Sequence, residues 1–103
     1  MHDLNIFHLD IKTDNLMFSP KQKKIVFIDY NLSEILSVKK GCKTLMSFRG
    51  TLQYCHSSMI EACLDNTKQH YIDPYFCDSY SLAISIKEIK KIIQNLGPME
   101  AYF

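Results

Sequence analysis

The longest hydrophobic pattern in the chain begins after Pro74. The stretch is apolar on nearly every side up to Ile86, and charged residues are interspersed beyond that point. A helix with such a pattern is buried on all sides over its first half and emerges into solvent over its second. Because Gly97 and Pro98 are stop signals, we predict a buried helix over about residues 75–94.

Two shorter apolar runs predict a small hairpin. Residues 16–18 form the first run, which Ser19 and Pro20 end in a turn. Residues 25–28 are β-branched and aromatic and are typical of a buried strand.

The remaining segments have weaker patterns. Residues 57–64 predict a short helix with a serine cap at its start, and residues 1–7 have the character of the tail of a helix. Residues 32–50 show no strong period, so we predict a long loop with one helical turn near residues 33–36. A hairpin and one short helix are too little to cover the long apolar helix. We therefore expect more protein around this piece, and self-association through its uncovered apolar surface.

Composition excludes several classes of protein. The chain has 103 residues, 47% of them apolar, which suits one small globular domain. A net charge of +1 gives no reason to expect nucleic acid or a membrane as a partner. We interpret the lysine clusters at 21–24 and 39–43 as solvated loop edges. The four cysteines have no metal-ligand spacing, and no signal peptide or bilayer-spanning run occurs, so a reduced, cytoplasmic protein is expected.

Residues 8–15 carry the most distinctive chemistry in the sequence. Asp10 can accept a proton from a hydroxyl, and Lys12 can neutralise charge on a transferring phosphoryl group. Asn15, and Asp29 at the end of the second hairpin strand, offer oxygen ligands of the kind that Mg²⁺ binds. The hairpin between them brings these two ligands together.

The order of the motifs resembles that of eukaryotic-type protein kinases of the serine/threonine type. Residues 8–15 match the catalytic loop His-Arg-Asp-x-Lys-x-x-Asn, and residues 29–31 stand where Asp-Phe-Gly is expected. Two later motifs of the family follow in the same order, at Gly50, Thr51 and Tyr54 and then at Asp78, Tyr80, Ser81 and Leu82. The match covers roughly residues 4–93, almost the whole chain.

The resemblance implies an α+β fold, a fragment of the kinase C-terminal lobe without the N-terminal lobe. The parts of this partial domain, residues 1–103, would be the catalytic loop 8–15, a magnesium-binding loop 29–31 within the activation segment 29–58, a short helix, and the buried helix at about 75–94.

The resemblance also implies the roles of single residues. Asp10 would be the catalytic base, and Lys12 would contact the γ-phosphate of ATP. Asn15 and Asp29 would hold Mg²⁺. Lysine at position 12, together with Thr51 in a catalytic role, is similar to serine/threonine kinases. Structural roles would fall to His8 and Asp78.

Departures from the family pattern bear on activity. Leu9 replaces an arginine that usually pairs with a phosphorylated activation loop, and Ser57 and Ser58 replace a Pro-Glu pair. No glycine-rich loop and no Val-Ala-Ile-Lys strand occur. We expect the chain alone to bind ATP weakly or not at all and to be inactive by itself.

Two functions remain open at this point. The first is phosphotransfer from Mg-ATP to a protein hydroxyl, as part of a larger domain. The second is a truncated, catalytically inactive kinase-like binding protein or remnant.

Overall fold

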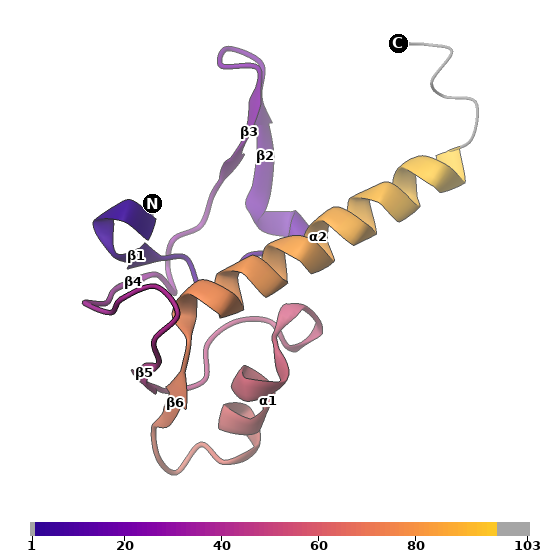
Figure 1. Ribbon diagram of the computed structural model, residues 1–103. Coiled ribbons are helices and arrows are strands. Elements are labelled where there is room, and N and C mark those ends of the chain that lie inside the picture. Colours follow the sequence, from indigo (N-terminus) through magenta and orange to yellow (C-terminus); the bar gives the residue numbers. More distant parts are fainter. Residues whose placement is uncertain (1, 97–103) are drawn as a thin grey trace.

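A computed structural model describes residues 2–96, apart from the side chains of Asp3 and Leu96. The fold is α+β, with two α-helices and short antiparallel strands that pair in two-stranded sheets (Figure 1). The chain measures 51 × 28 × 23 Å along its principal axes. The long helix α2 extends well beyond the other elements (Figure 1).

Helix α2, Pro74–Leu96, confirms the predicted long helix. Proline suits the first helical position, and the Asp73 carboxylate accepts a hydrogen bond from the amide of Phe76 at 3.1 Å. The stop signals Gly97 and Pro98 lie outside the described residues.

The prediction that α2 is buried on all sides up to Ile86 was wrong. Cys77 and Ser85 are buried, but Phe76 is 50% exposed and Ile86 is 45% exposed. The other elements surround only the first half of the helix, and its far half projects away from them (Figure 1).

The predicted hairpin is present as β2, Leu16–Ser19, and β3, Lys24–Phe27. The strands pair antiparallel, with Leu16 opposite Phe27 and Phe18 opposite Ile25. The expectation of a buried second strand was wrong, since Ile25 is 61% exposed. The hairpin projects away from the core, so its apolar residues find no second layer (Figure 1).

Two further strand pairs lie where a loop or helix was predicted. Strands β1, Ile6–Phe7, and β4, Glu34–Ile35, pair antiparallel, so the helical turn predicted near residues 33–36 was wrong. Strand β5, Thr44–Met46, pairs with β6, His70–Ile72. The predicted helical tail at residues 1–7 is a single 3₁₀ turn, His2–Leu4, followed by β1.

Helix α1, Ser57–Leu64, has the predicted bounds but a different cap. The cap is His56, whose Nδ1 accepts a hydrogen bond from the Ser58 amide at 3.2 Å. The His56 ring also packs edge-on against Phe76 and Tyr80 of α2, with centroids 4.7 and 5.2 Å away. The cap therefore also fastens α1 to α2.

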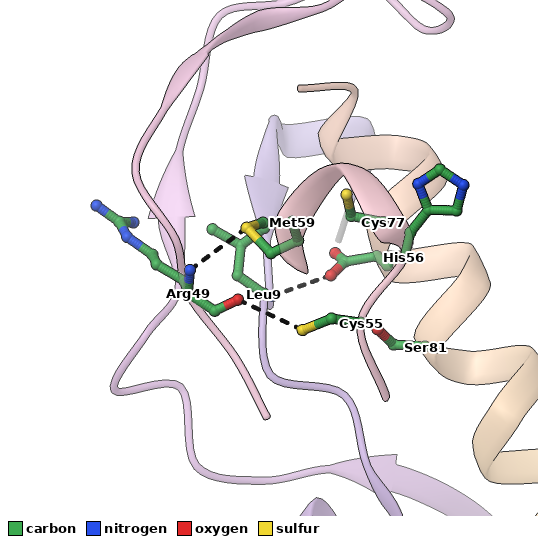
Figure 2. A pocket seen from close by; sticks show the side chains of 8 residues that line it. Leu9, Arg49, Cys55, His56, Met59, Cys77 and Ser81 are labelled. Atoms are coloured by element: carbon green, nitrogen blue, oxygen red, sulfur yellow. Dashed lines mark hydrogen bonds between the residues drawn. The ribbon is translucent and has the colours of Figure 1, made fainter. Parts of the chain in front are cut away.

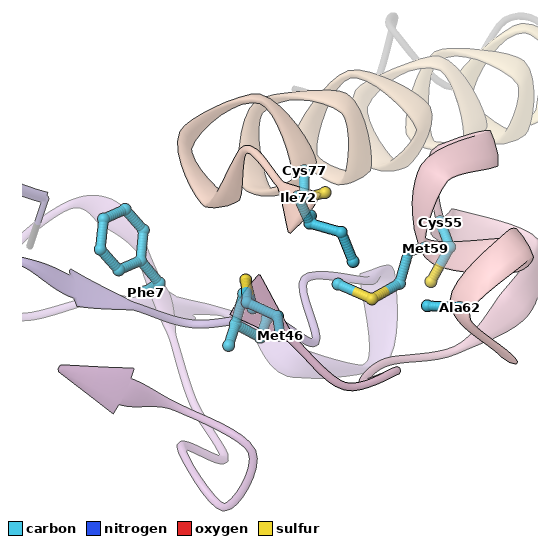
Figure 3. Packing of buried hydrophobic residues seen from close by; sticks show 8 residues of the cluster. Phe7, Met46, Cys55, Met59, Ala62, Ile72 and Cys77 are labelled. Carbon is cyan, nitrogen blue, oxygen red and sulfur yellow. The ribbon is translucent and has the colours of Figure 1, made fainter. Parts of the chain in front are cut away.

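One hydrophobic cluster joins these elements. It contains Phe7 of β1, Met46 of β5, Met59 of α1, Ile72 of β6 and Cys77 of α2 (Figure 3). Each of these side chains is at most 6% exposed. Since residues 8–15 continue directly from β1, this core fixes the chain at the point where the candidate site begins.

Candidate active site

Asp10, Lys12 and Thr51 are joined by hydrogen bonds. The Thr51 hydroxyl donates to Asp10 Oδ1 at 3.0 Å and accepts from Lys12 Nζ at 3.0 Å. Thr51 directly precedes the 3₁₀ helix Leu52–Tyr54, which contacts α2. The fold therefore brings a distant hydroxyl to the two charged groups that sequence analysis placed in the reaction.

Asn15 ends a short 3₁₀ helix, Thr13–Asn15, and is only 5% exposed. Its amide nitrogen donates to the backbone oxygen of Asp10 at 2.9 Å and to Asp10 Oδ2 at 3.3 Å. These bonds join the two ends of the segment from Asp10 to Asn15. They also leave the amide oxygen of Asn15 as the atom that a cation would bind.

Asp29 lies two residues after β3, and Asn15 lies directly before β2. Both residues are therefore at the open end of the hairpin. The Ile28 amide donates to the Asn15 backbone oxygen at 2.9 Å, which joins the two segments one residue before Asp29. Asp29 has a left-handed backbone (φ 59°), and its exposed carboxylate accepts from the Asn31 amide at 3.3 Å. Both donor groups are hard oxygens, which fit Mg²⁺ together with phosphate and water oxygens. Within residues 2–96, no group of three or more His, Cys, Asp and Glu side chains forms a metal site.

His8 is fully buried, and its ring bonds the backbone of two loops. Its Nε2 lies 2.9 Å from the Ile28 carbonyl oxygen, and its Nδ1 lies 3.2 Å from the Asp10 amide. An amide can only donate, so Nδ1 accepts, and Nε2 carries the proton that bonds Ile28. The ring also packs against Tyr30 at 5.0 Å. One side chain thus links the loop of Asp10 to the loop of Asp29.

Asp78 of α2 anchors the backbone of His8 and Leu9. Its carboxylate, 2% exposed, accepts from the amides of His8 and Leu9 at 3.0 and 2.9 Å. His2 Nε2 lies 2.9 Å from the same carboxylate. A buried carboxylate needs such partners, because an unpaired one is costly in a low-dielectric interior.

Leu9 has an uncommon conformation for its size, with φ 64° and 5% exposure. It lies among Arg49, Cys55, Met59 and Cys77 (Figure 2), beside a cavity of about 10 Å³ that has room for no more than one water molecule. At Gly50 (φ 116°), a Cβ would lie 3.0 Å from the Leu9 carbonyl oxygen. Glycine there lets the segment before Thr51 lie directly against the backbone of Leu9.

The thiols beside this cavity are poor nucleophiles. Burial, followed by the negative charge of Asp10, raises the pKa of Cys55 to about 11. Burial also raises the pKa of Cys77 to about 11. Both therefore remain protonated at neutral pH, where a reactive cysteine needs its thiolate form.

Sequence analysis missed a second hydrogen-bonded group, formed by Thr13, Tyr54 and Glu88. The Tyr54 hydroxyl donates to Glu88 Oε2 at 2.6 Å, and Thr13 Oγ1 lies 3.1 Å from that hydroxyl and donates to Glu88 Oε1 at 3.3 Å. The bond to Glu88 raises the pKa of Tyr54 above its usual 10.0. Glu88 lies in the part of the helix that sequence analysis expected to emerge into solvent, and it joins Thr13 and Tyr54 to α2.

A signal for Glu88 was present in the sequence. Ser81, Ser85 and Glu88 follow at helical spacing and form a polar stripe along an apolar helix. Ser81 donates to the Tyr54 carbonyl oxygen at 2.6 Å, and Ser85 donates to the Ser81 carbonyl oxygen at 2.9 Å. The contact of His2 with Asp78 had no comparable signal.

Comparison with known families identifies the class of protein. A family model described as the protein kinase domain matches residues 1–95. The chain belongs to the protein kinase domain family. Membership indicates kinase-type phosphotransfer, and proteins of this family generally use ATP and Mg²⁺ and act on proteins. No curated protein and no solved structure matches the chain. Among the described residues, no helix is long and apolar enough to cross a bilayer.

Proposed function

We propose that this chain is the catalytic part of the C-terminal lobe of a serine/threonine protein kinase, which transfers the γ-phosphate of Mg-ATP to a protein hydroxyl. The observation that carries the proposal is the joined set of Asp10, Thr51 and Lys12. In this lobe, residues 8–15 are the catalytic loop, residues 29–31 the magnesium-binding loop and residues 29–58 the activation segment.

Asp10 acts on the substrate hydroxyl. It already accepts a hydrogen bond from the aliphatic hydroxyl of Thr51, so its carboxylate is placed to accept one from a serine or threonine of a protein. The bond would orient the hydroxyl oxygen toward the γ-phosphorus of bound ATP. As that oxygen forms its bond to phosphorus, the bond from phosphorus to the bridging oxygen breaks, ADP leaves, and Asp10 would take up the hydroxyl proton.

Lys12 and Thr51 act together in this proposal. The ammonium group of Lys12 contacts the γ-phosphate, where a positive charge stabilises the negative charge that develops during transfer. Thr51 holds that ammonium group beside Asp10. This pairing of a loop lysine with a threonine supports the serine/threonine type.

Asn15 and Asp29 would hold Mg²⁺, which neutralises charge on the phosphates of ATP when bound. His8 and Asp78 would be structural, since both are buried and bond the loop backbone. The partners that follow are ATP, a protein substrate and, through exposed apolar surface, a second copy of the chain.

A phosphotransfer assay tests the proposal. Transfer from radiolabelled ATP to a serine- and threonine-containing peptide library is measured for the 103-residue chain and for the longest natural product that contains it. We expect no transfer from the chain alone. We expect transfer from the longer product, and its loss by at least about a thousandfold in the Asp10→Asn and Asp29→Asn variants.

Matched controls make the result decisive. Asp14→Asn removes an exposed carboxylate from the same loop and should retain activity, unlike Asp10→Asn. Transfer that survives Asp10→Asn would refute the assigned role. A longer product without any transfer would favour a catalytically inactive kinase-like binding protein instead.

A further inference from the structure

An open groove lies beside the start of α2, and none of Asp10, Lys12, Asn15, Asp29 and Thr51 lines it. Its volume is about 490 Å³, and part of its lining comes from the proposed activation segment. It lies between the chain before β1, the segment after β4 and the first turn of α2. Its walls are formed by Asn5, Ser37, Val38, Lys39, Lys40 and Tyr75.

Hydrogen bonds connect the walls of this groove. The Leu36 amide donates to the Asn5 carbonyl oxygen at 2.9 Å, and the Tyr75 hydroxyl donates to the Val38 carbonyl oxygen at 3.4 Å. The Tyr75 ring also packs edge-on against the fully buried Phe7, with centroids 4.8 Å apart. The segment that carries the lysines is therefore fastened to Asn5, just before β1, and to Tyr75 of α2, so the backbone on both sides of the groove is held in place.

The turn that follows is also ordered by a backbone bond. The Cys42 amide donates to the Lys39 carbonyl oxygen at 2.9 Å, and Gly41 takes a left-handed conformation (φ 86°) that glycine adopts readily. This turn fixes the backbone positions of Lys39 and Lys40.

The groove carries a local excess of positive charge. Within residues 2–96, the ammonium groups of Lys39 and Lys40 have no described carboxylate within 4.0 Å. The sequence contains no Asp or Glu between positions 35 and 60, and Arg49 in that stretch is paired with Glu34. Both lysines are exposed, so their charges are accessible to an anion from outside the described chain.

We propose that this groove binds a phosphorylated serine or threonine of another polypeptide. Two ammonium groups, the Ser37 hydroxyl and the Asn5 amide supply charged and neutral donors for phosphate oxygens. Val38 and the ring of Tyr75 supply an apolar wall for the neighbouring peptide residue. An anionic membrane fits less well, because membrane-binding segments present four to eight basic residues on an open surface. The proposal goes beyond phosphotransfer and does not depend on Asp10.

Fluorescence anisotropy of a labelled, alanine-rich peptide with one central phosphoserine tests this site. The full chain is compared with the double variant Lys39→Gln/Lys40→Gln and with the matched control Lys21→Gln/Lys24→Gln, whose exposed lysines lie at the hairpin. Circular dichroism first establishes that all three proteins are folded. The same peptide with unmodified serine, inorganic phosphate as competitor, and vesicles containing phosphatidylserine complete the set of probes.

We expect the phosphopeptide to bind the wild-type chain and the hairpin control equally. Binding to the double variant, and binding of the unmodified peptide, should be weaker by at least about tenfold, the loss expected for one charge-assisted hydrogen bond. Inorganic phosphate should compete. Equal binding to the double variant, an equal loss in the hairpin control, or binding of the vesicles without binding of the phosphopeptide would each overturn the proposal.

Discussion

The Tyr54 hydroxyl, buried between Glu88 and Thr13, couples stability to pH at the scale of one residue. Because its pKa is raised above 10.0, the folded chain keeps a proton that the unfolded chain releases. Stability therefore falls as the pH rises above about 10, in the window between the unfolded and the folded pKa.

The variant Tyr54→Phe tests this coupling. At pH 7 it should be less stable than the wild type by about 2 kcal/mol, since a charged carboxylate loses a short donor. The difference should shrink above pH 10, because only the wild type then loses the stabilising proton. Urea unfolding at pH 7, 9 and 10.5 measures both effects. Tyr71→Phe, at a side chain 69% exposed, should show neither effect, and a difference for Tyr54→Phe that is constant with pH would refute the coupling.

A second prediction at this scale concerns Gly50 and Gly41. Both have positive φ, but a Cβ at Gly50 would lie 3.0 Å from the Leu9 carbonyl oxygen, whereas a Cβ at Gly41 meets nothing within 4 Å. We expect Gly41→Ala to cost about 1 kcal/mol through backbone conformation alone. Gly50→Ala should cost about 3 kcal/mol, because the clash adds to the strain. Thermal unfolding of the pair measures the difference, and equal losses would contradict the close contact.

Sequence reasoning reaches some residues of the candidate site and not others. Fixed spacing within one segment identifies Asp10, Lys12 and Asn15, because the chemistry needs these groups close together on one loop. The contact between Thr51 and Asp10 depends on a left-handed Gly50, which only a backbone in three dimensions displays. The bond between His2 and Asp78 spans most of the chain and leaves no local pattern.

At the scale of elements, α2 holds the backbone of His8 and Leu9 through the carboxylate of Asp78. In the variant Asp78→Asn, one accepting oxygen becomes an NH₂ group that faces the donor of His8 or Leu9. We expect a loss of about 3 kcal/mol in unfolding free energy, since a buried donor then has no acceptor. Urea unfolding measures it against Asp14→Asn, an exposed carboxylate that should change little. Equal stability of the two variants would show that the anchor contributes nothing.

Elements with local signals were predicted well, and elements made by distant pairing were not. Helices α1 and α2 follow from hydrophobic patterns and from stop or start residues within their own segments. Strands β4 and β5 have two and three residues and gain their hydrogen bonds from β1 and β6. A run that short has no period of its own, so partners far along the chain decide its conformation.

At the scale of the whole molecule, the far half of α2 presents apolar side chains to solvent. Ile86, Ile92 and Ile93 are 45–52% exposed on a helix that stands free of the core (Figure 1). Contiguous apolar surface of this kind drives association. We expect the 103-residue chain to self-associate at micromolar concentration.

Sedimentation velocity over a range of concentrations measures this association. The variant Ile86→Lys/Ile93→Lys should shift the chain toward the monomer. Leu64→Lys is the control, because Leu64 is an apolar residue that is 82% exposed on α1. This variant should not change the fraction of monomer. A wild-type chain that stays monomeric throughout would contradict the prediction.

The Asp78 carboxylate anchors the loop of residues 8–15, and this contact affects hydrogen exchange. The amides of His8 and Leu9 donate to a carboxylate of α2 rather than to a neighbouring strand. Their exchange with deuterated solvent therefore requires the loop and the helix to separate, and their protection reports the free energy of that separation. We expect both amides to show one common protection factor, set by the undocking of α2, whereas the exposed turn of the hairpin exchanges independently. The loop of residues 8–15 would then open as part of a cooperative unit that also contains α2.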